Sequence, residues 1–144
     1  MPEPTPVARV GVADLSSGWG RTLVFAYGVF AVAATGRSAV QLGEDPTTLP
    51  YWLSLVAAVL YLVATTCLLI GGRAAWRVAS VAVSVELVGV LVVGAWSYLD
   101  ADLFHDKTVW SHFGQGYAFL PLVLPFAGLA WLRHTRPVNT SVAA

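Results

Sequence analysis

The sequence predicts an all-α membrane protein, a transmembrane bundle of four antiparallel helices with a proline kink in the fourth. Three observations predict this fold. The chain of 144 residues is 57% hydrophobic and 11% charged, whereas about a quarter of the residues in soluble domains are charged. Its apolar residues fall into four long runs, and the loops between the runs are too short to fold alone. The runs cover residues 22–42, 51–70, 78–99 and 114–132.

Each run is long enough to cross a bilayer, because about 20 apolar residues rising about 1.5 Å each span a hydrocarbon core of about 30 Å. Residues 1–20, rich in Pro and Gly, are predicted to form a flexible cytoplasmic leader before the bundle of residues 21–134, and residues 135–144 a cytoplasmic tail. One alternative stays open at the first run. The sequence Ala31-Val-Ala33 is also typical of a signal-peptide cleavage site, and cleavage there would leave three spans.

Small residues recur in the first three runs, where they let helix backbones approach closely in lipid. They are Gly28, Ala31, Ala34, Thr35 and Gly36 in the first run, Ala57, Ala58 and Ala64 in the second, and Gly89 and Gly94 in the third. This pattern favours a compact antiparallel bundle. The single cysteine, Cys67, lies in the second run, so the sequence offers no disulfide framework and no thiolate metal cluster.

The fourth run differs from the others because it contains Pro121 and Pro125. Each proline lacks a backbone N–H and clashes with the preceding helical turn. The sequence therefore predicts that this helix is kinked or begins near Pro121. Carbonyl groups freed at a kink need donors from neighbouring helices or water, and we expect Tyr61 or Thr65 of the second run to supply them.

The distribution of Arg and Lys predicts the orientation in the membrane. Six of these residues flank the runs on one side, namely Arg9, Arg21, Arg73, Arg77, Arg133 and Arg136, and only Arg37 and Lys107 fall on the other. Because cytoplasmic loops carry the excess of positive charge, both termini are expected in the cytoplasm of a multi-pass plasma-membrane protein. The acidic residues between the runs, Glu44, Asp45, Asp100, Asp102 and Asp106, then lie outside.

Two charged residues fall inside the predicted spans. Glu86 lies roughly 13 Å from the cytoplasmic end of its helix, near the middle of the bilayer, at about the same depth as Tyr61. The Tyr61 hydroxyl is thus the expected partner of the Glu86 carboxyl. Arg37 lies roughly 24 Å up its helix, about 6 Å short of the outer boundary. It can extend toward headgroups or reach inward toward Glu86.

Ionisable residues inside membranes are candidates for function. Glu86 can be a titratable proton or cation site. It can equally be a hydrogen-bonded acid that fixes the packing of the bundle, or an anchor for the helix of another subunit. The small multidrug transporters are similar in size and span count, but they place their acid in the first span, where this chain has none.

The loop before the fourth run carries possible metal ligands, Asp102, His105, Asp106 and His112. Their spacing matches no metal-binding motif, so the sequence predicts a solvated loop and no metal site. Haem is not expected either, because no histidine falls within a span. No nucleophile is paired with a base, and no basic patch suits nucleic acid. We therefore expect no cofactor, no enzymatic activity and no nucleic-acid partner.

In composition the chain resembles the small four-helix integral membrane proteins of actinobacteria. Its spans are rich in Ala, Val and Leu, and it contains more Arg than Lys. The resemblance covers the whole chain and implies a four-span bundle without assigning an activity. With minimal loops and abundant packing residues, the sequence predicts an accessory or assembly subunit of a larger membrane complex. Its partners are then the lipid bilayer and a membrane protein or further copies of the chain. The alternative is a homo-oligomeric, proton-linked carrier or channel for small solutes that uses Glu86.

Overall fold

The computed structural model describes residues 18–104 and 108–135. These residues form four α-helices and one 3₁₀ helix, with no strand among them. The elements are α1 (Gly18–Glu44), α2 (Leu49–Ile70), α3 (Arg73–Leu99), the 3₁₀ helix η1 (Ser111–Tyr117) and α4 (Leu120–His134). The all-α bundle predicted from the sequence is confirmed.

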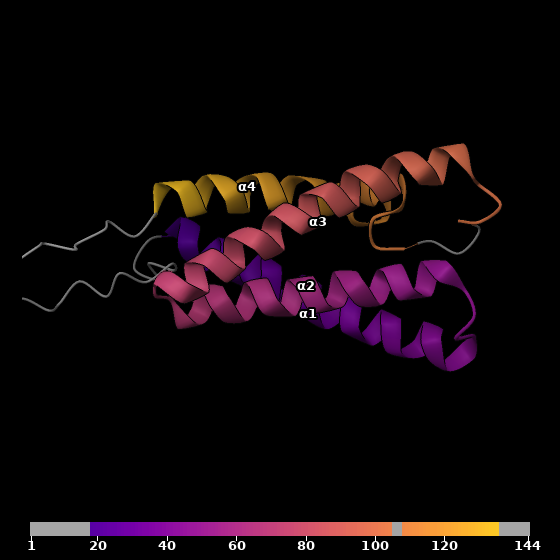
Figure 1. Ribbon diagram of the computed structural model, residues 1–144, viewed down its shortest axis with the longest axis horizontal. Coiled ribbons are helices and arrows are strands. Elements are labelled where there is room, and N and C mark those ends of the chain that lie inside the picture. Colours follow the sequence, from indigo (N-terminus) through magenta and orange to yellow (C-terminus); the bar gives the residue numbers. More distant parts are fainter. Residues whose placement is uncertain (1–17, 105–107, 136–144) are drawn as a thin grey trace, which may run out of the picture.

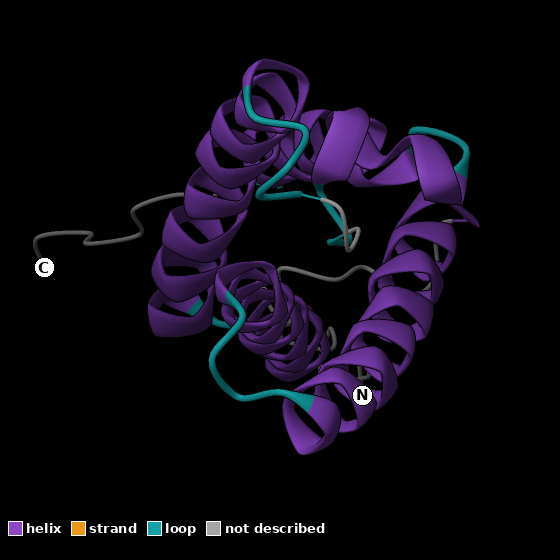
Figure 2. Ribbon diagram, turned by 90° about the vertical axis from the view of Figure 1, so that its right-hand side faces the viewer, coloured by secondary structure: helices purple, strands orange, loops and turns teal. Residues whose placement is uncertain are grey.

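The helices run up and down along one long axis (Figure 1). The start of α1 and the end of α4 lie at the same end of the bundle, and the α1–α2 loop lies at the other end. Toward that second end, the pair of α1 and α2 diverges from α3. The chain after α3 turns back between the helices there (Figure 2), and Phe104, Val109 and Trp110 join the buried core. We call the described residues 100–104 and 108–119 the re-entrant segment.

Three helices, α1, α2 and α3, are long and apolar enough to cross a membrane, so the chain is a multi-pass integral membrane protein. The fourth apolar run does not form one straight helix. Helix α4 has 15 residues, which span about 22 Å and are too short for the full hydrocarbon core. It meets η1 at a bend of 98°, and the two together have the length and composition either of one broken span or of a re-entrant loop.

The bend lies immediately before the prolines. Ala118 and Phe119 adopt left-handed backbone conformations, with φ of 54° and 60°. Helix α4 then begins at Leu120, rather than at Gly114 as the apolar run predicted. Pro121 stands in the first helical turn, where its missing N–H costs nothing, and Pro125 lies inside the helix. Of the two outcomes that the sequence allowed, the structure has the helix that begins near Pro121.

Two glycines of α3 make room for the re-entrant segment. A Cβ atom at Gly89 would lie 2.7 Å from the ring of Trp110, and one at Gly94 would overlap the ring of Phe113. Aromatic rings therefore fill the notches that these glycines leave on α3. The predicted close packing at small residues is present here, but the partner of α3 at these positions is the re-entrant segment.

Candidate functional site

Two polar regions lie inside the bundle at different heights. The first, the buried acid centre, comprises Tyr27, Tyr61 and Glu86 from α1, α2 and α3, which are all fully buried. The second, the outer cavity, lies where the re-entrant segment meets α1. Its lining residues are Arg37, Thr108, Ser111, His112, Gln115, Gly116 and Tyr117.

Glu86 occupies the inward face of α3 between buried Val83 and Val90. Neither of its carboxyl oxygens has a hydrogen-bond partner within the described part of the chain. An unpartnered carboxyl in an apolar interior is costly, whether it is charged or neutral. Because the side chain is 0% exposed inside its own bundle, it is not available to the helix of another subunit.

Tyr27 is the hydroxyl that faces Glu86. Its oxygen also lies 2.8 Å from the position that a Cβ atom would take at Gly128, so the hydroxyl fits only because α4 has a glycine there. Electrostatic interactions join Glu86 to both tyrosines, and the two tyrosine rings lie 6.2 Å apart. All four long helices therefore meet around this carboxyl group.

The expected hydrogen bond between Tyr61 and Glu86 is not formed within the described residues, because neither Glu86 carboxyl oxygen has a hydrogen-bond partner there, although the two side chains interact electrostatically. The Tyr61 hydroxyl accepts a hydrogen bond from Nε1 of Trp110 at 3.2 Å. Counting residues along the helices gives the depth of Tyr61 in the membrane. It does not give the direction of the side chain, which depends on which hydrogen-bond donor lies beside it. The re-entrant segment carries the indole of Trp110 into the bundle and provides that donor.

Two further contacts that the sequence allowed are not formed within the described residues, the inward pairing of Arg37 with Glu86 and a bond from Thr65 to the proline region of α4. The Arg37 guanidinium donates from Nη1 to the Tyr117 hydroxyl at 3.1 Å, whereas Glu86 accepts no hydrogen bond in the described residues. Thr65 donates to the Tyr61 carbonyl of its own helix at 2.7 Å. It therefore does not serve the proline region of α4, because its own backbone offers a nearer acceptor.

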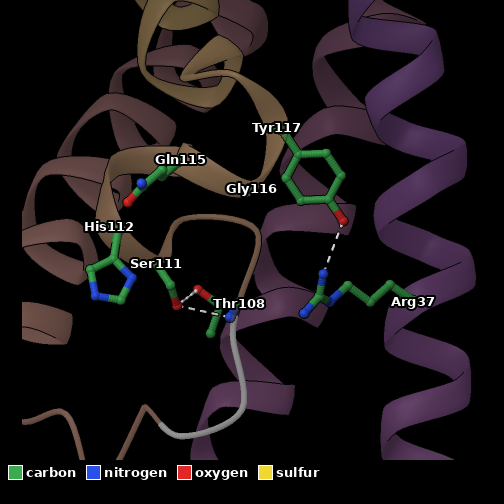
Figure 3. A pocket seen from close by; sticks show the side chains of 7 residues that line it. All are labelled: Arg37, Thr108, Ser111, His112, Gln115, Gly116 and Tyr117. Carbon is green, nitrogen blue, oxygen red and sulfur yellow. Dashed lines mark hydrogen bonds between the residues drawn. The ribbon is translucent and has the colours of Figure 1, made fainter.

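The outer cavity has a volume of about 500 Å³. Arg37 enters it from α1, and the other described lining residues lie between Thr108 and Tyr117 of the re-entrant segment (Figure 3). The Arg37 side chain extends across the space toward Tyr117, and Thr108 and Ser111 lie on the neighbouring turn. The cavity therefore combines one cationic side chain with several neutral hydrogen-bonding groups.

Local hydrogen bonds hold the turn that carries the polar lining. Ser111 Oγ accepts the backbone N–H of Thr108 at 2.8 Å, and Thr108 Oγ1 accepts that of Trp110 at 3.1 Å. The backbone N–H of His112 donates to Ser97 Oγ on α3 at 2.8 Å. The turn is thus fixed both internally and to α3.

The solvated loop that the sequence predicted is present only in its first part, because Asp100 to Asp102 are exposed but Thr108 to Ser111 are buried. The buried part was not predicted because the hydroxyl groups of Thr108 and Ser111 accept the backbone N–H groups of this turn, which then need no water. As for the possible metal ligands, Asp102 is exposed and the His112 ring packs edge-on against Tyr98 at 4.5 Å. His105 and Asp106 lie outside the described residues. Within residues 18–104 and 108–135, no group of three potential ligands assembles.

Sequence reasoning identified Arg37 but missed most residues around it. One feature of the sequence could have indicated a buried segment here. The stretch Thr108-Val-Trp-Ser-His-Phe-Gly-Gln-Gly-Tyr117 mixes aromatic, small and polar residues. It is too polar for a lipid-facing helix and too aromatic for a solvated loop. Comparisons with protein-family models, with curated proteins and with solved structures gave no match.

Proposed function

We propose that the protein is a non-enzymatic accessory or assembly subunit of a larger complex in the plasma membrane, with both termini in the cytoplasm. The observation that carries this proposal is an apolar groove of about 590 Å³ on the lipid-facing side of α1 and α2. Its lining residues are Val24, Phe25, Gly28, Val29, Val32, Ala33, Thr65 and Leu69.

Three of the residues that line this groove, Gly28, Ala33 and Thr65, are small. Gly28 leaves a notch in α1, where an added Cβ would meet only the Thr65 methyl group at 3.8 Å. In lipid, helices associate through close packing at such positions rather than through burial alone. A transmembrane helix of a partner that places bulky side chains in the notch would gain this packing, and a second copy of the chain could use the same groove.

The test is co-purification of the tagged chain from its host in mild detergent, followed by mass spectrometry. We expect a stoichiometric membrane protein with the native chain and its loss in Gly28→Leu, which fills the groove. Gly36→Leu is the matched control, because Gly36 lies on the same helix with no atom within 4 Å of an added Cβ. Recovery of the native chain without a stoichiometric partner, or equal loss in both variants, would contradict the proposal.

A second candidate function rests on the buried acid centre. Glu86 is a fully buried carboxyl that faces the Tyr27 hydroxyl at the point where all four helices meet, and buried acids of this kind carry protons in membrane carriers. In this case the protein is a homo-oligomeric, proton-linked carrier or channel. Each chain then holds its own proton site, because Glu86 is enclosed within a single bundle.

Proton flux into liposomes containing the purified chain tests this candidate. We expect flux with the native chain, none with Glu86→Gln, and native flux with Glu44→Gln, which changes an exposed acid at the end of α1. Normal folding of Glu86→Gln, checked by circular dichroism and size-exclusion chromatography, would assign the loss to the carboxyl. Absence of flux in the native chain, or misfolding of Glu86→Gln, would make Glu86 a structural residue.

A further inference from the structure

We infer that a groove between α2 and α3 binds an anionic phospholipid, with one acyl chain in the groove and the phosphate of the headgroup at Arg77. This α2–α3 groove is separate from the groove on α1 and α2 and from the buried acid centre, so the inference goes beyond the proposed function. Its lining, its depth in the membrane and the charge at one end support this ligand.

The α2–α3 groove has a volume of about 360 Å³. Six apolar side chains line it, namely Leu60 and Val63 on α2 and Val78, Val81, Ala82 and Val85 on α3. The three valines are exposed at the surface of the bundle. Because α2 and α3 are membrane-spanning helices, this apolar surface faces the lipid tails.

The groove follows one leaflet of the bilayer. Arg77 lines one end of it, and Val85 lies eight residues further along α3, a distance of about 12 Å. One leaflet contributes about 15 Å to the hydrocarbon core. Helix α3 has 27 residues and is about 40 Å long, about 10 Å more than the core. The apolar part of α3 begins at Val78, so Arg77 lies at the level of the headgroups and the groove extends from there toward the middle of the bilayer.

The end of the bundle beside Arg77 is positively charged. Arg73 lies one helical turn before Arg77 on the same side of α3, and both side chains are exposed. The acidic residues that the structure describes lie at the opposite end or in the interior; they are Glu44, Asp45, Glu86, Asp100 and Asp102. Residues 1–17 and 136–144 contain two arginine and two acidic residues in all, so they add no net side-chain charge to this end, wherever they lie.

An anionic phospholipid matches both parts of the groove. A guanidinium can donate two parallel N–H···O bonds to a phosphate, and an acyl chain that runs inward from the phosphate covers the apolar lining. The ammonium group of a zwitterionic headgroup would be repelled by Arg73 and Arg77, whereas an anionic headgroup would not. A spanning helix of a partner would lie against the full core of about 30 Å, but this groove ends near the middle of the bilayer.

The test uses the full-length chain, delipidated in maltoside detergent, and native mass spectrometry. Phosphatidylglycerol and phosphatidylcholine with the same acyl chains are titrated separately. We expect phosphatidylglycerol to bind at least about fivefold more tightly, the contribution of one basic residue at an anionic membrane surface. Equal binding of the two lipids, or a dimer that binds neither lipid, would overturn the inference.

Two arginine variants connect the preference to the groove. Arg77→Gln should bind phosphatidylglycerol about fivefold more weakly than the native chain, with unchanged binding of phosphatidylcholine. Arg133→Gln is the matched control, because it removes one positive charge from an exposed position in the last turn of α4, at the same end of the bundle. It should keep the native preference. A preference that survives in Arg77→Gln, or that is lost equally in Arg133→Gln, would indicate diffuse attraction to the basic end and would overturn the inference.

A second pair of variants tests the acyl chain. Val81→Phe should weaken the binding of both lipids by filling the groove, and it is expected to fold because Val81 is 64% exposed. Val92→Phe is the control on the same helix, since Val92 is 55% exposed and lies about 22 Å from Arg77 along α3, in the other leaflet. It should bind as the native chain does. Undiminished binding in Val81→Phe, or equal weakening in both variants, would contradict the placement of the acyl chain.

Discussion

Tyr27 and Tyr61 are buried residues of the same type near the same carboxyl group, but they have different surroundings. The Tyr61 hydroxyl is bonded to Trp110, whereas the Tyr27 hydroxyl has no hydrogen-bond partner in the described residues and fits against Gly128. Their depth in the membrane could be predicted from the sequence by counting residues. Their partners could not, because these depend on the rotation of each helix and on where the re-entrant segment enters.

The hydrogen bond from Trp110 to the Tyr61 hydroxyl is expected to stabilise the bundle measurably. Trp110→Phe keeps an aromatic ring but removes the indole donor and leaves the buried Tyr61 hydroxyl unpaired, which costs about 1–3 kcal/mol. A double-mutant cycle with Tyr61→Phe should give a coupling of about 0.5–1.5 kcal/mol in the free energy of unfolding. Denaturation of the purified variants in micelles measures this coupling. A coupling near zero would show that the bond does not contribute.

Asp45, in the α1–α2 loop, should make this loop sensitive to acid. Hydrogen bonds from the side chains of Thr47 and Thr48 and from the backbone N–H of Thr47 hold the pKa of Asp45 below its ordinary value. A carboxyl group whose pKa is lower in the folded state stabilises that state above the unfolded pKa of about 3.9. This contribution is lost as the pH falls through the folded pKa.

An NMR titration of the Asp45 carboxyl should therefore give a midpoint below about 3.9. The loop signals should change over the same pH range. Asp45→Asn should remove this change, and Glu44→Gln, at the adjacent position, should leave it intact. A midpoint at or above the ordinary value would refute the effect of the two threonines.

At the scale of elements, hydropathy predicted α1, α2 and α3 because a continuous apolar run of that length in a membrane protein usually forms a spanning helix. It could not predict the shape of the fourth apolar run. The apolar stretch from Tyr117 to Leu124 suits a lipid-facing helix and a segment folded back into the bundle equally well. The left-handed conformations of Ala118 and Phe119 have no compositional signal, since glycine is the residue usually found in such positions.

The fit between Gly94 and Phe113 is the most direct test of the re-entrant segment. Gly94→Ala should destabilise the protein by about 1–3 kcal/mol, because the new methyl group would overlap the Phe113 ring. Gly36→Ala, with no atom within 4 Å of the added Cβ, should be neutral or stabilising by up to about 1 kcal/mol. Adding Phe113→Leu to Gly94→Ala should restore part of the loss. Equal effects of the two alanine substitutions would contradict this packing.

At the scale of the whole molecule, the two polar regions are connected along the bundle axis. Phe30 packs against Tyr61 of the buried acid centre and against Tyr117 of the outer cavity, with ring centroids 5.7 Å apart in both pairs. Trp110, which belongs to the re-entrant segment that lines the cavity, donates a hydrogen bond to Tyr61 on α2. A structural change in either region can therefore reach the other through side chains that are in direct contact.

The topology itself can be tested with single cysteines in a Cys67→Ala background. The start of α1 and the end of α4 lie at one end of the bundle (Figure 1), and most Arg and Lys residues flank this end. A membrane-impermeant maleimide should therefore label Thr47→Cys and Asp102→Cys in intact cells. It should label Ala74→Cys and Arg133→Cys only after permeabilisation. The reverse pattern would invert the orientation that we infer from the positive charges. Labelling of Ala74→Cys and Arg133→Cys from opposite sides would show that η1 and α4 do not complete a crossing, and that the bent pair enters and leaves the membrane on the same face.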